Sequence, residues 1–279
     1  MCCGLSGKTL VVVVGTILVV VVLVLGASLG SVFGKQCEKK SQDCLPFALD
    51  MAPDSVDDMY NNCEVKMKEK IENEFLQNEK NKDKNFKEAW NKAEKYYNSK
   101  WANNNTPLKK EQIMAAHAYT LEEPALYCDF NNAVRKQNSE YKTTFQYHTL
   151  HFYLTMALRT IKPTAENCVT VYRRTNCKFS KDVQNKEIRL GAFSSSSMGD
   201  YSDPEFGTKS CFEITTCFGA SISKFSKFPD EREVLIPPYE VFKVTAIKEN
   251  SKKNKLPCEV VYTLESTKTT QSNLNCALI

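Results

Sequence analysis

The sequence predicts an α+β protein with a helical N-terminal half and a C-terminal half built of strands. Apolar residues recur at helical spacing from about residue 64 to residue 101. After Pro163 the pattern changes to short β-branched and aromatic runs between polar turns. Because helices precede strands instead of alternating with them, and no repeat or composition shift marks a second core, both halves are expected in one domain with mainly antiparallel strands.

Composition places the chain among ordinary globular proteins. It has 279 residues, of which 25% are charged and 42% apolar, and this balance argues against disorder. Lys and Arg number 37 against 33 Asp and Glu, a formal net charge of +4. So small an excess does not indicate a nucleic-acid partner, and none is expected.

Residues 1–34 carry a targeting signal. No charge occurs between residues 10 and 34, and a stretch of about 25 residues is long enough to span a bilayer. Lys8 and the small-x-small site Ser28-Leu29-Gly30 are equally typical of a cleaved signal peptide, so a signal peptide and a signal-anchor segment both remain open. Either one sends residues 35–279, a single domain with a short polar tail, into the secretory pathway.

The destination is therefore the cell surface, the endoplasmic reticulum membrane or the outside of the cell. The membrane is a partner only if the N-terminal segment stays uncleaved. The C-terminal tail has no hydrophobic run of the length that a GPI signal needs, so no GPI anchor is expected.

Cysteine usage agrees with an oxidising compartment. Of 12 cysteines, Cys2 and Cys3 precede the hydrophobic stretch and ten follow it, with no CxxC pair among them. Disulfides are the expected use, although spacing does not give their connectivity. Asn104-Asn105-Thr106 is a candidate N-glycosylation sequon, weakened by Pro107.

The helical half should contain four helices. An apolar stripe from Val65 to Tyr97, interrupted at Asn78–Asn85, predicts two of them. Residues 113–119 predict a short third helix. A fourth is expected to begin near Ser139, with Glu140 in its first turn, and to end at Pro163.

Five apolar runs predict the strands of the second half. Each is rich in β-branched or aromatic residues and is bounded by polar turns. They are residues 168–173, 188–193, 211–222, 233–247 and 258–266.

The sequence lacks the motifs of several common nucleotide-binding and hydrolase families. The sequence has no GxGxxG, no Walker A loop and no GxSxG elbow. His148 and His151 have the i, i+3 spacing of helical ligands, but no acidic third ligand is close, so local packing is the favoured interpretation and no metal is expected.

Three segments carry residue types suited to binding a phosphorylated ligand. Arg173 ends a strand, and a guanidinium matches two phosphate oxygens at once. Residues 193–197 place a row of serine hydroxyls at a strand end. Glu231 and Glu233 lie two apart before an apolar strand, so strand geometry points both to one face, where like charges are costly unless a ligand shares them. Each segment taken alone has a simpler interpretation as surface or turn.

In their order and spacing, these segments resemble the ecto-ADP-ribosyltransferases, the vertebrate arginine-specific mono-ADP-ribosyltransferases with an R-S-E active site. The likeness covers roughly residues 50–265. The motif matches are VYR at 171–173, FxSxS at 193–197 and ExEVLIPPYEVF at 231–242; FNNAVR at 130–135, LHFYLTMAL at 150–158 and CFEITTCFGASI at 211–222 support them.

The resemblance implies the ADP-ribosyltransferase fold, in which the helical half packs on a mainly antiparallel β-sandwich core that holds an NAD cleft. It implies NAD or NADP as co-substrate and no metal. The implied reaction transfers ADP-ribose to the arginine of a protein, or to a small guanidino acceptor, and releases nicotinamide.

The family pattern also assigns roles to residues. It implies that Arg173 binds the NAD phosphates, that Ser195 helps to hold the nicotinamide ribose and that Glu233 is the catalytic carboxylate. Glu231 goes with arginine acceptors. Phe206 loosely matches a position that packs on nicotinamide.

Two other functions remain open on the same fold. One is a mainly hydrolytic NAD glycohydrolase, and the other is an inactive cell-surface binding module. Arg174 departs from the mammalian pattern, which has Gly there; its guanidinium could reinforce phosphate binding, point to solvent or crowd the nicotinamide. The resemblance implies the disulfides Cys63–Cys258 and Cys168–Cys217, with Cys177–Cys211 as a plausible third.

Overall fold

A computed structural model describes residues 47–162, 164–201 and 204–279, which belong to one compact unit, Cys44–Ile279. The expected targeting segment, residues 1–34, lies outside the described residues. Within the described part of the chain, no helix is both long enough and apolar enough to cross a membrane.

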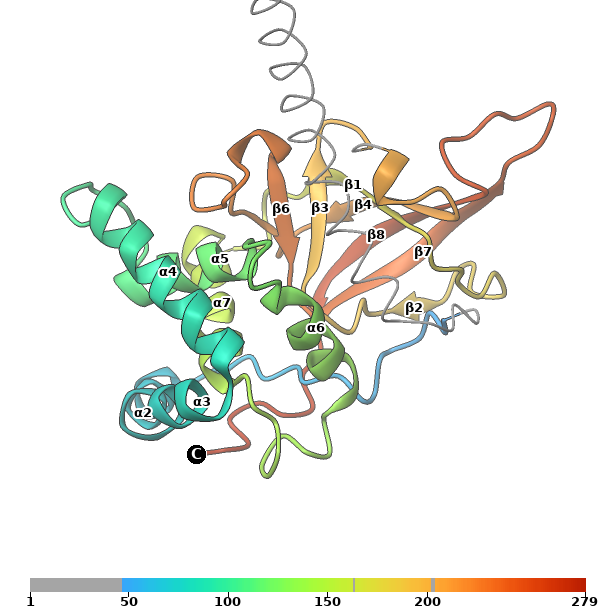
Figure 1. Cartoon of the computed structure of the whole chain (residues 1–279). Helices are drawn as coiled ribbons and strands as arrows, with labels where there is room; N and C mark the ends of the chain where they lie inside the picture. Colours follow the sequence, from blue (N-terminus) through green and yellow to red (C-terminus); the bar gives the residue numbers. More distant parts are fainter. Residues whose placement is uncertain (1–46, 163, 202–203) are drawn as a thin grey trace, which may run out of the picture. The chain divides into compact units, whose positions relative to one another are not determined.

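The first half of this unit is helical (Figure 1). Its elements are α2 (Glu64–Lys70), the π-helical turn η1 (Ile71–Phe75), α3 (Leu76–Lys82), α4 (Lys84–Lys100), α5 (Lys110–Tyr119), α6 (Leu126–Lys136) and α7 (His148–Ile161). The predicted break in the first stripe falls at Asp83, whose carboxylate accepts the backbone N–H groups of Asn85 and Phe86 at 2.8 and 3.1 Å. This N-cap starts α4 as a separate helix.

Two expectations for the helices were wrong. The fourth predicted helix begins at His148 and not near Ser139. The Glu140 carbonyl instead accepts the N–H groups of Thr143, Thr144 and Phe145, which closes a turn that does not continue into the helix. The other error is α6, which was not predicted. Four of its five buried residues, Leu126, Phe130, Ala133 and Val134, have helical spacing, but polar residues between them weaken the stripe.

The second half forms one mixed sheet of eight strands among the described residues. They are β1 (Val169–Thr175), β2 (Glu187–Ile188), β3 (Ser194–Met198), β4 (Ser210–Thr216), β5 (Ala220–Ser221), β6 (Glu233–Ile236), β7 (Glu240–Glu249) and β8 (Val260–Thr270). Their order is β2-β7-β8-β4-β1-β3-β6-β5, and β4–β8 is the one parallel pair in it. The predicted α+β class and mainly antiparallel pairing are confirmed.

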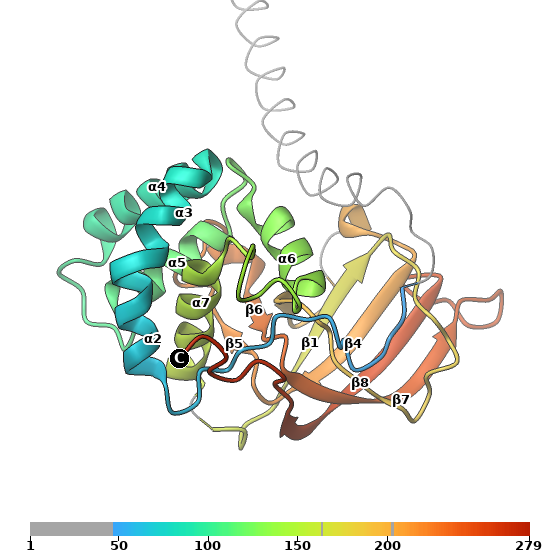
Figure 2. The same cartoon turned by 90° about the horizontal axis from the view of Figure 1, so that it is seen from below.

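All eight strands are hydrogen-bonded into one continuous sheet. Its two parts are joined where β1 pairs with β3 through only two residue pairs, Val171–Met198 and Tyr172–Ser197. Figure 2 shows β1, β4, β8 and β7 side by side, with the helices gathered toward the other end of the sheet. Helix α7 packs against the edge strand β5.

Strand boundaries differ from the prediction at three places. The run 188–193 contributes only the end of β2, because Gly191 has a φ of +70° and its backbone lies against the Ala52 side chain. The serine run forms a full strand, β3, where only a strand end was expected. The run 233–247 is divided at Pro237-Pro238, which separates β6 from β7 because proline cannot donate a ladder hydrogen bond.

Three disulfides join described cysteines. Cys168–Cys217 is confirmed. The expected Cys63–Cys258 and Cys177–Cys211 are wrong, because the bonds are Cys63–Cys276 and Cys211–Cys258. Strands β4 and β8 run parallel with Ser210 opposite Val260, which brings Cys211 and Cys258 together at the same end. Cys128 is also disulfide-bonded.

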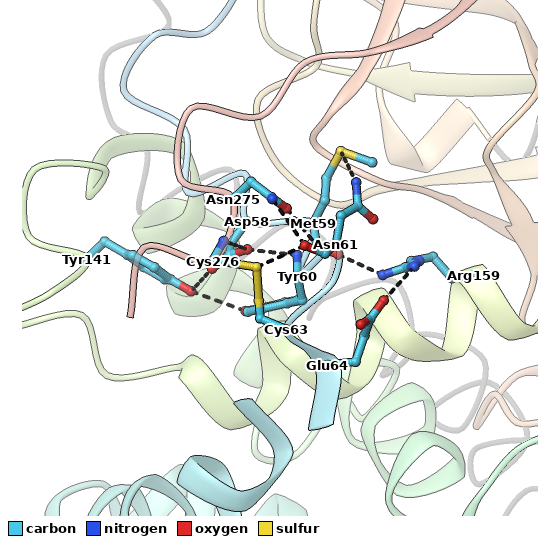
Figure 3. Close-up of a disulfide and its surroundings, with 10 residues drawn as sticks. All are labelled: Asp58, Met59, Tyr60, Asn61, Cys63, Glu64, Tyr141, Arg159, Asn275 and Cys276. Atoms are coloured by element: carbon cyan, nitrogen blue, oxygen red, sulfur yellow. Dashed lines mark hydrogen bonds and ion pairs between the residues drawn. A yellow bond between two sulfur atoms is a disulfide. The ribbon is translucent and has the colours of Figure 1, made fainter. Parts of the chain in front are cut away.

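The C-terminal tail returns to the start of the described chain. Figure 3 shows Cys276 bonded to Cys63 ahead of α2, with the Cys276 backbone N–H donating to the Asp58 carboxylate at 3.0 Å. The Tyr141 hydroxyl donates to the other oxygen of Asp58 at 2.8 Å. The tail is therefore held by a covalent bond and by a buried carboxylate.

A buried ion pair fastens the same two segments to the sheet. Arg189, next to β2, donates from Nη1 to Asp57 at 2.6 Å, and both side chains are fully buried. Asp57 also accepts the backbone N–H groups of Asn273 and Leu274 at 2.8 and 3.1 Å. The remaining Arg189 donors reach three carbonyl oxygens, those of Met51, Ala52 and Gln271. Every charge in the pair is therefore hydrogen-bonded.

Removing one member of this pair should destabilise the protein strongly. We expect Arg189→Met to cost about 3–5 kcal/mol of unfolding free energy, because it leaves Asp57 charged, buried and unpaired. Urea unfolding monitored by circular dichroism measures the loss.

Arg159→Met is the matched control. Arg159 pairs with Glu64 at 3.0 Å, but these side chains are 35% and 38% exposed, so its loss should cost about 1 kcal/mol or less. Equal losses in the two variants would contradict a special role for the buried pair.

Candidate active site

The pairing of β3 with β6 sets the centre of the site. Ser195 lies opposite Leu235, and Ser197 lies opposite Glu233. Alternate residues of a strand share a face, so Ser195 and Ser197 point to the same side as Glu233. The Ser195 hydroxyl donates to Glu233 Oε1 from this diagonal position.

Glu233 is the most constrained carboxyl of the group. It is 7% exposed, and burial raises its pKa to about 7; the Ser195 hydrogen bond and Arg173 act against burial, whereas the charge of Glu231 adds to it. Its backbone carbonyl accepts the N–H of Ile222 at 3.0 Å and the hydroxyl of Ser223 at 3.2 Å. The carboxyl is thus fixed at its backbone and poised between its two protonation states at neutral pH.

Arg173 reaches this pair from the neighbouring strand β1. Its Nη1 donates to the Ser195 carbonyl at 2.6 Å, and its charge lowers the pKa of Glu233. The structure therefore brings together Arg173, Ser195 and Glu233, the three residues that the sequence analysis proposed as catalytic.

Glu231 differs from Glu233 in its setting. It lies in the 3-10 turn η3 (Pro229–Glu231), and Arg232, with a φ of +50°, turns the chain before β6 begins. Strand alternation does not extend to Glu231, so the sequence argument that placed both carboxylates on one strand face was wrong. Glu231 is exposed on the surface, and partial burial together with Glu122 raises its pKa.

Arg174 points away from the group. Alternation along β1 puts it with Tyr172 on the face opposite Arg173, where Tyr201 covers both. Its Nη1 donates to the Gly207 carbonyl at 3.3 Å. Arg174 therefore neither reinforces Arg173 nor crowds Ser195 and Glu233.

Phe206 and Asn104 were also candidate site residues, and both lie apart from Arg173, Ser195 and Glu233. Phe206 ends the 3-10 turn η2 (Pro204–Phe206), which contacts β1, and its side chain is 45% exposed. The hydrogen bonds and charges that join Arg173, Ser195 and Glu233 do not include it. Asn104 is exposed in the turn that follows α4, on the surface that a glycosylation site requires.

Helices α5 and α6 add residues that sequence reasoning missed. Burial lowers the pKa of Arg135, and the charge of Arg173 lowers it further, so the two guanidinium groups interact electrostatically. Arg135 Nη1 contacts Asn132 Oδ1 at 3.3 Å. Asn131, one turn before Arg135, donates from Nδ2 to the Tyr119 hydroxyl at 2.9 Å. Both residues lie in FNNAVR at 130–135, which the sequence analysis matched to the family without assigning a role to either one.

The paired histidines are packing residues. His151 is fully buried, with Nδ1 2.7 Å from the Tyr60 hydroxyl and Nε2 2.9 Å from the Val56 carbonyl. His148 stacks on Phe75 at 4.2 Å. Across the residues the structure describes, no group of three or more His, Cys, Asp or Glu side chains is arranged to hold a metal ion.

A buried carboxyl held by a serine, with an arginine beside it, is suited to a ligand that joins phosphates to a sugar. Comparison with known proteins agrees. The family model for NAD:arginine ADP-ribosyltransferases matches residues 49–269. The chain belongs to this family.

Named relatives support the assignment. The chain is 34% identical over 245 residues to "Ecto-ADP-ribosyltransferase 5" of Rattus norvegicus, covering 83% of this chain and 76% of the relative. It is 35% identical over 207 residues to the "Erythroblast NAD(P)(+)--arginine ADP-ribosyltransferase" of Gallus gallus, covering 71% and 67%.

Among solved structures, the chain is similar to the eucaryotic mono-ADP-ribosyltransferase ART2.2, crystallised as a mutant in complex with NADH. The TM-score is 0.69 at 33% sequence identity, over 83% of this chain and 99% of that chain. The helical half and the sheet are therefore those of the family.

The neighbours of Glu233 should move its titration in opposite directions. Ser195→Ala removes a hydrogen bond to the ionised form, so we expect the pKa of Glu233 to rise above about 7. Glu231→Gln removes a like charge, so we expect the pKa to fall. A ¹³C NMR titration of the glutamate carboxyl, assigned by its loss in Glu233→Gln, measures both; shifts of the same sign would contradict this account.

Proposed function

We propose that this protein is a mono-ADP-ribosyltransferase that transfers ADP-ribose from NAD or NADP to arginine side chains and releases nicotinamide. The observation that carries the proposal is the contact among Arg173, Ser195 and Glu233 on three neighbouring strands. Membership of the family and similarity to a transferase crystallised with NADH support it.

Arg173 and Arg135 are proposed to hold the diphosphate of the co-substrate. They are neighbouring cations, and no salt bridge of the described residues includes either of them. Two close guanidinium groups repel each other, so a dianionic diphosphate between them would relieve the repulsion and accept their forked donors.

Glu233 is proposed to act on the ribose. Breaking the bond between C1′ and nicotinamide builds positive charge on the sugar, an oxocarbenium-like state. An ionised Glu233 hydrogen-bonded to the ribose 2′-OH would stabilise that charge most strongly in the transition state. Ser195, already bonded to Glu233, would help to hold the same ribose. One such preorganised contact is worth about 3 kcal/mol in other enzymes.

Glu231 is proposed to receive the acceptor. A guanidinium keeps its proton up to about pH 12 and is a poor nucleophile until a base takes that proton. Glu231 is exposed, lies two residues from Glu233 and has a raised pKa, all of which suit a base that meets a substrate from outside. The partner would be an arginine-bearing protein or a small guanidino molecule.

The proposed place of action is the secretory pathway, at the cell surface, in the endoplasmic reticulum membrane or outside the cell. Three disulfides among described residues favour an oxidising compartment. The named rat relative is an ecto-enzyme. Whether residues 1–34 are cleaved or keep the protein in a membrane is a separate part of this proposal.

The reaction is tested with the oxidised full-length protein, labelled NAD and agmatine as acceptor. We expect label on agmatine. Glu233→Gln should lower all turnover by at least about a hundredfold, because it removes the carboxylate that stabilises the transition state. Glu231→Gln should abolish agmatine labelling but retain nicotinamide release, since water then replaces the acceptor.

Other outcomes would redirect the proposal. Nicotinamide release without agmatine labelling in the unsubstituted protein would identify an NAD glycohydrolase. A folded protein that neither binds nor turns over NAD would be a binding module on this fold.

Arg135 is tested by NAD affinity. We expect Arg135→Ala and Arg173→Ala each to weaken NAD binding at least about tenfold, because each removes a charged hydrogen-bond donor to phosphate. Arg174→Ala is the matched control, since this neighbouring arginine lies on the opposite face of β1. Isothermal titration calorimetry gives the three dissociation constants, and an equal loss in Arg174→Ala would refute the assignment by face.

A further inference from the structure

Tyr119 is a residue of the helical half whose hydroxyl contacts the backbone just before β3. It is the last residue of α5 and is only 3% exposed. Its ring meets Phe130 of α6 edge to face, with centroids 6.2 Å apart and an interplanar angle of 85°. A buried ring packed in this way has one orientation, so the position of its hydroxyl is fixed.

The hydroxyl uses both its donor and its acceptor capacity. It accepts a hydrogen bond from Asn131 Nδ2 at 2.9 Å and donates to the Phe193 carbonyl at 3.3 Å. Burial and the nearby Glu233 raise the pKa of Tyr119 to about 12, so the phenol keeps its proton at physiological pH. It is thus a neutral group whose single proton is donated to the Phe193 carbonyl.

Tyr119 connects helix α6 to β3, the strand that carries Ser195. Phe193 directly precedes β3, so the bond to its carbonyl fixes the backbone just before Ser195. Ser195, Glu233 and Arg173 all influence the pKa of the same phenol. Three residues of the proposed site therefore act on a single side chain of the helical half.

Asn131 is committed to this contact. Its Nδ2 donates to Tyr119, whereas its Oδ1 is buried with no hydrogen-bond partner among the described residues. An unpaired buried acceptor costs roughly 1–3 kcal/mol, so an apolar residue here would serve stability better. This cost is explained if the position serves the site and not the core.

We propose that Tyr119, held in place by Asn131, is a positioning residue that fixes Ser195 against Glu233. The proposal rests on the proposed transferase function, because it concerns the same carboxylate. Tyr119 does not take part in the reaction itself; it acts through Ser195 and the start of β3.

Two separate sets of hydrogen bonds act on Ser195. Asn131 donates to Tyr119, and Tyr119 donates to the Phe193 carbonyl, which fixes the backbone just before β3. The Ser195 hydroxyl donates to Glu233, a bond that favours the ionised carboxylate. Removing the phenol should therefore loosen Ser195 and disfavour the charged state of Glu233.

The test is Tyr119→Phe in the oxidised full-length protein, with two readouts. The first is the ¹³C titration of the Glu233 carboxyl in the absence of NAD, where we expect the midpoint to rise by about half a pH unit. The second is kcat/KM for nicotinamide release across pH, where we expect about a five- to tenfold loss at neutral pH and the same upward move of the acidic limb.

Tyr262→Phe is the matched control. Tyr262 is likewise fully buried, and its hydroxyl donates to the backbone carbonyl of Phe179 at 2.9 Å, a bond made outside the trio of Arg173, Ser195 and Glu233. Its removal should cost similar stability and leave the Glu233 midpoint unchanged. A Tyr119→Phe protein that loses stability as Tyr262→Phe does, with no move of the midpoint, would show that Tyr119 is structural only and overturn the proposal.

A double-mutant cycle tests the role of Asn131. If Asn131 acts through Tyr119, then Asn131→Ala should raise the midpoint less than Tyr119→Phe, and the double variant should match Tyr119→Phe alone. Additive shifts would exclude this route. Because the carboxyl titration needs no turnover, it decides the positioning role even if the protein proves not to transfer ADP-ribose.

Discussion

The burial of the Glu233 carboxyl is the constraint on which the site depends. Desolvation alone drives its pKa upward, and a neutral acid could not stabilise a cationic sugar. The hydroxyl of Ser195 and the charge of Arg173 act against desolvation and hold the group near pKa 7. The site can therefore combine a water-poor environment, which strengthens electrostatic contacts, with a charge that such an environment resists.

Backbone context separates two glutamates that the sequence presents as a matched pair. Glu233 starts β6, whose four residues are all buried, and its carbonyl accepts hydrogen bonds from Ile222 and Ser223 in the preceding loop. Glu231 lies two residues earlier, in a turn that ends at the left-handed Arg232. One carboxyl is therefore rigid and nearly dry, whereas the other is exposed at the entrance to the strand. This difference suits one to a transition state inside the protein and the other to an acceptor that arrives from outside.

Much of this arrangement could be predicted from the sequence. Apolar period and turn residues were enough to find the α+β order and the helices around Asp83, because those signals are local. Arg173, Ser195 and Glu233 were found because their motifs survive in order and spacing. The setting of Glu231 was not, because the period-2 argument assumes an unbroken strand and nothing in Asp230-Glu231-Arg232 announces the left-handed turn.

The contributions of α6 and of the tail were lost for other physical reasons. Polar residues on the face of α6 that meets the site weaken the apolar stripe from which a helix is predicted. The residues proposed for function therefore made α6 hard to predict from the sequence. The disulfide partners depend on which strands are neighbours. The parallel pairing of β4 with β8, which brings Cys211 to Cys258, is a tertiary choice that no local signal encodes.

Two disulfides join the strands on one side of the site. Cys168–Cys217 joins β1 to β4 at the end where Val169 lies opposite Thr216. Cys211–Cys258 joins β4 to β8, so the strand that carries Arg173 belongs to a covalently linked group of three strands. By contrast, β1 meets β3 through only two residue pairs, and no described disulfide crosses that seam. Yet the seam is where Arg173 must reach Ser195. What holds it is polar: the Arg173 bond to the Ser195 carbonyl and, from the helical side, the Tyr119 bond to the Phe193 carbonyl. This short join between β1 and β3 is thus closed by the residues of the proposed active site, which couples the alignment of the two parts of the sheet to the proposed chemistry.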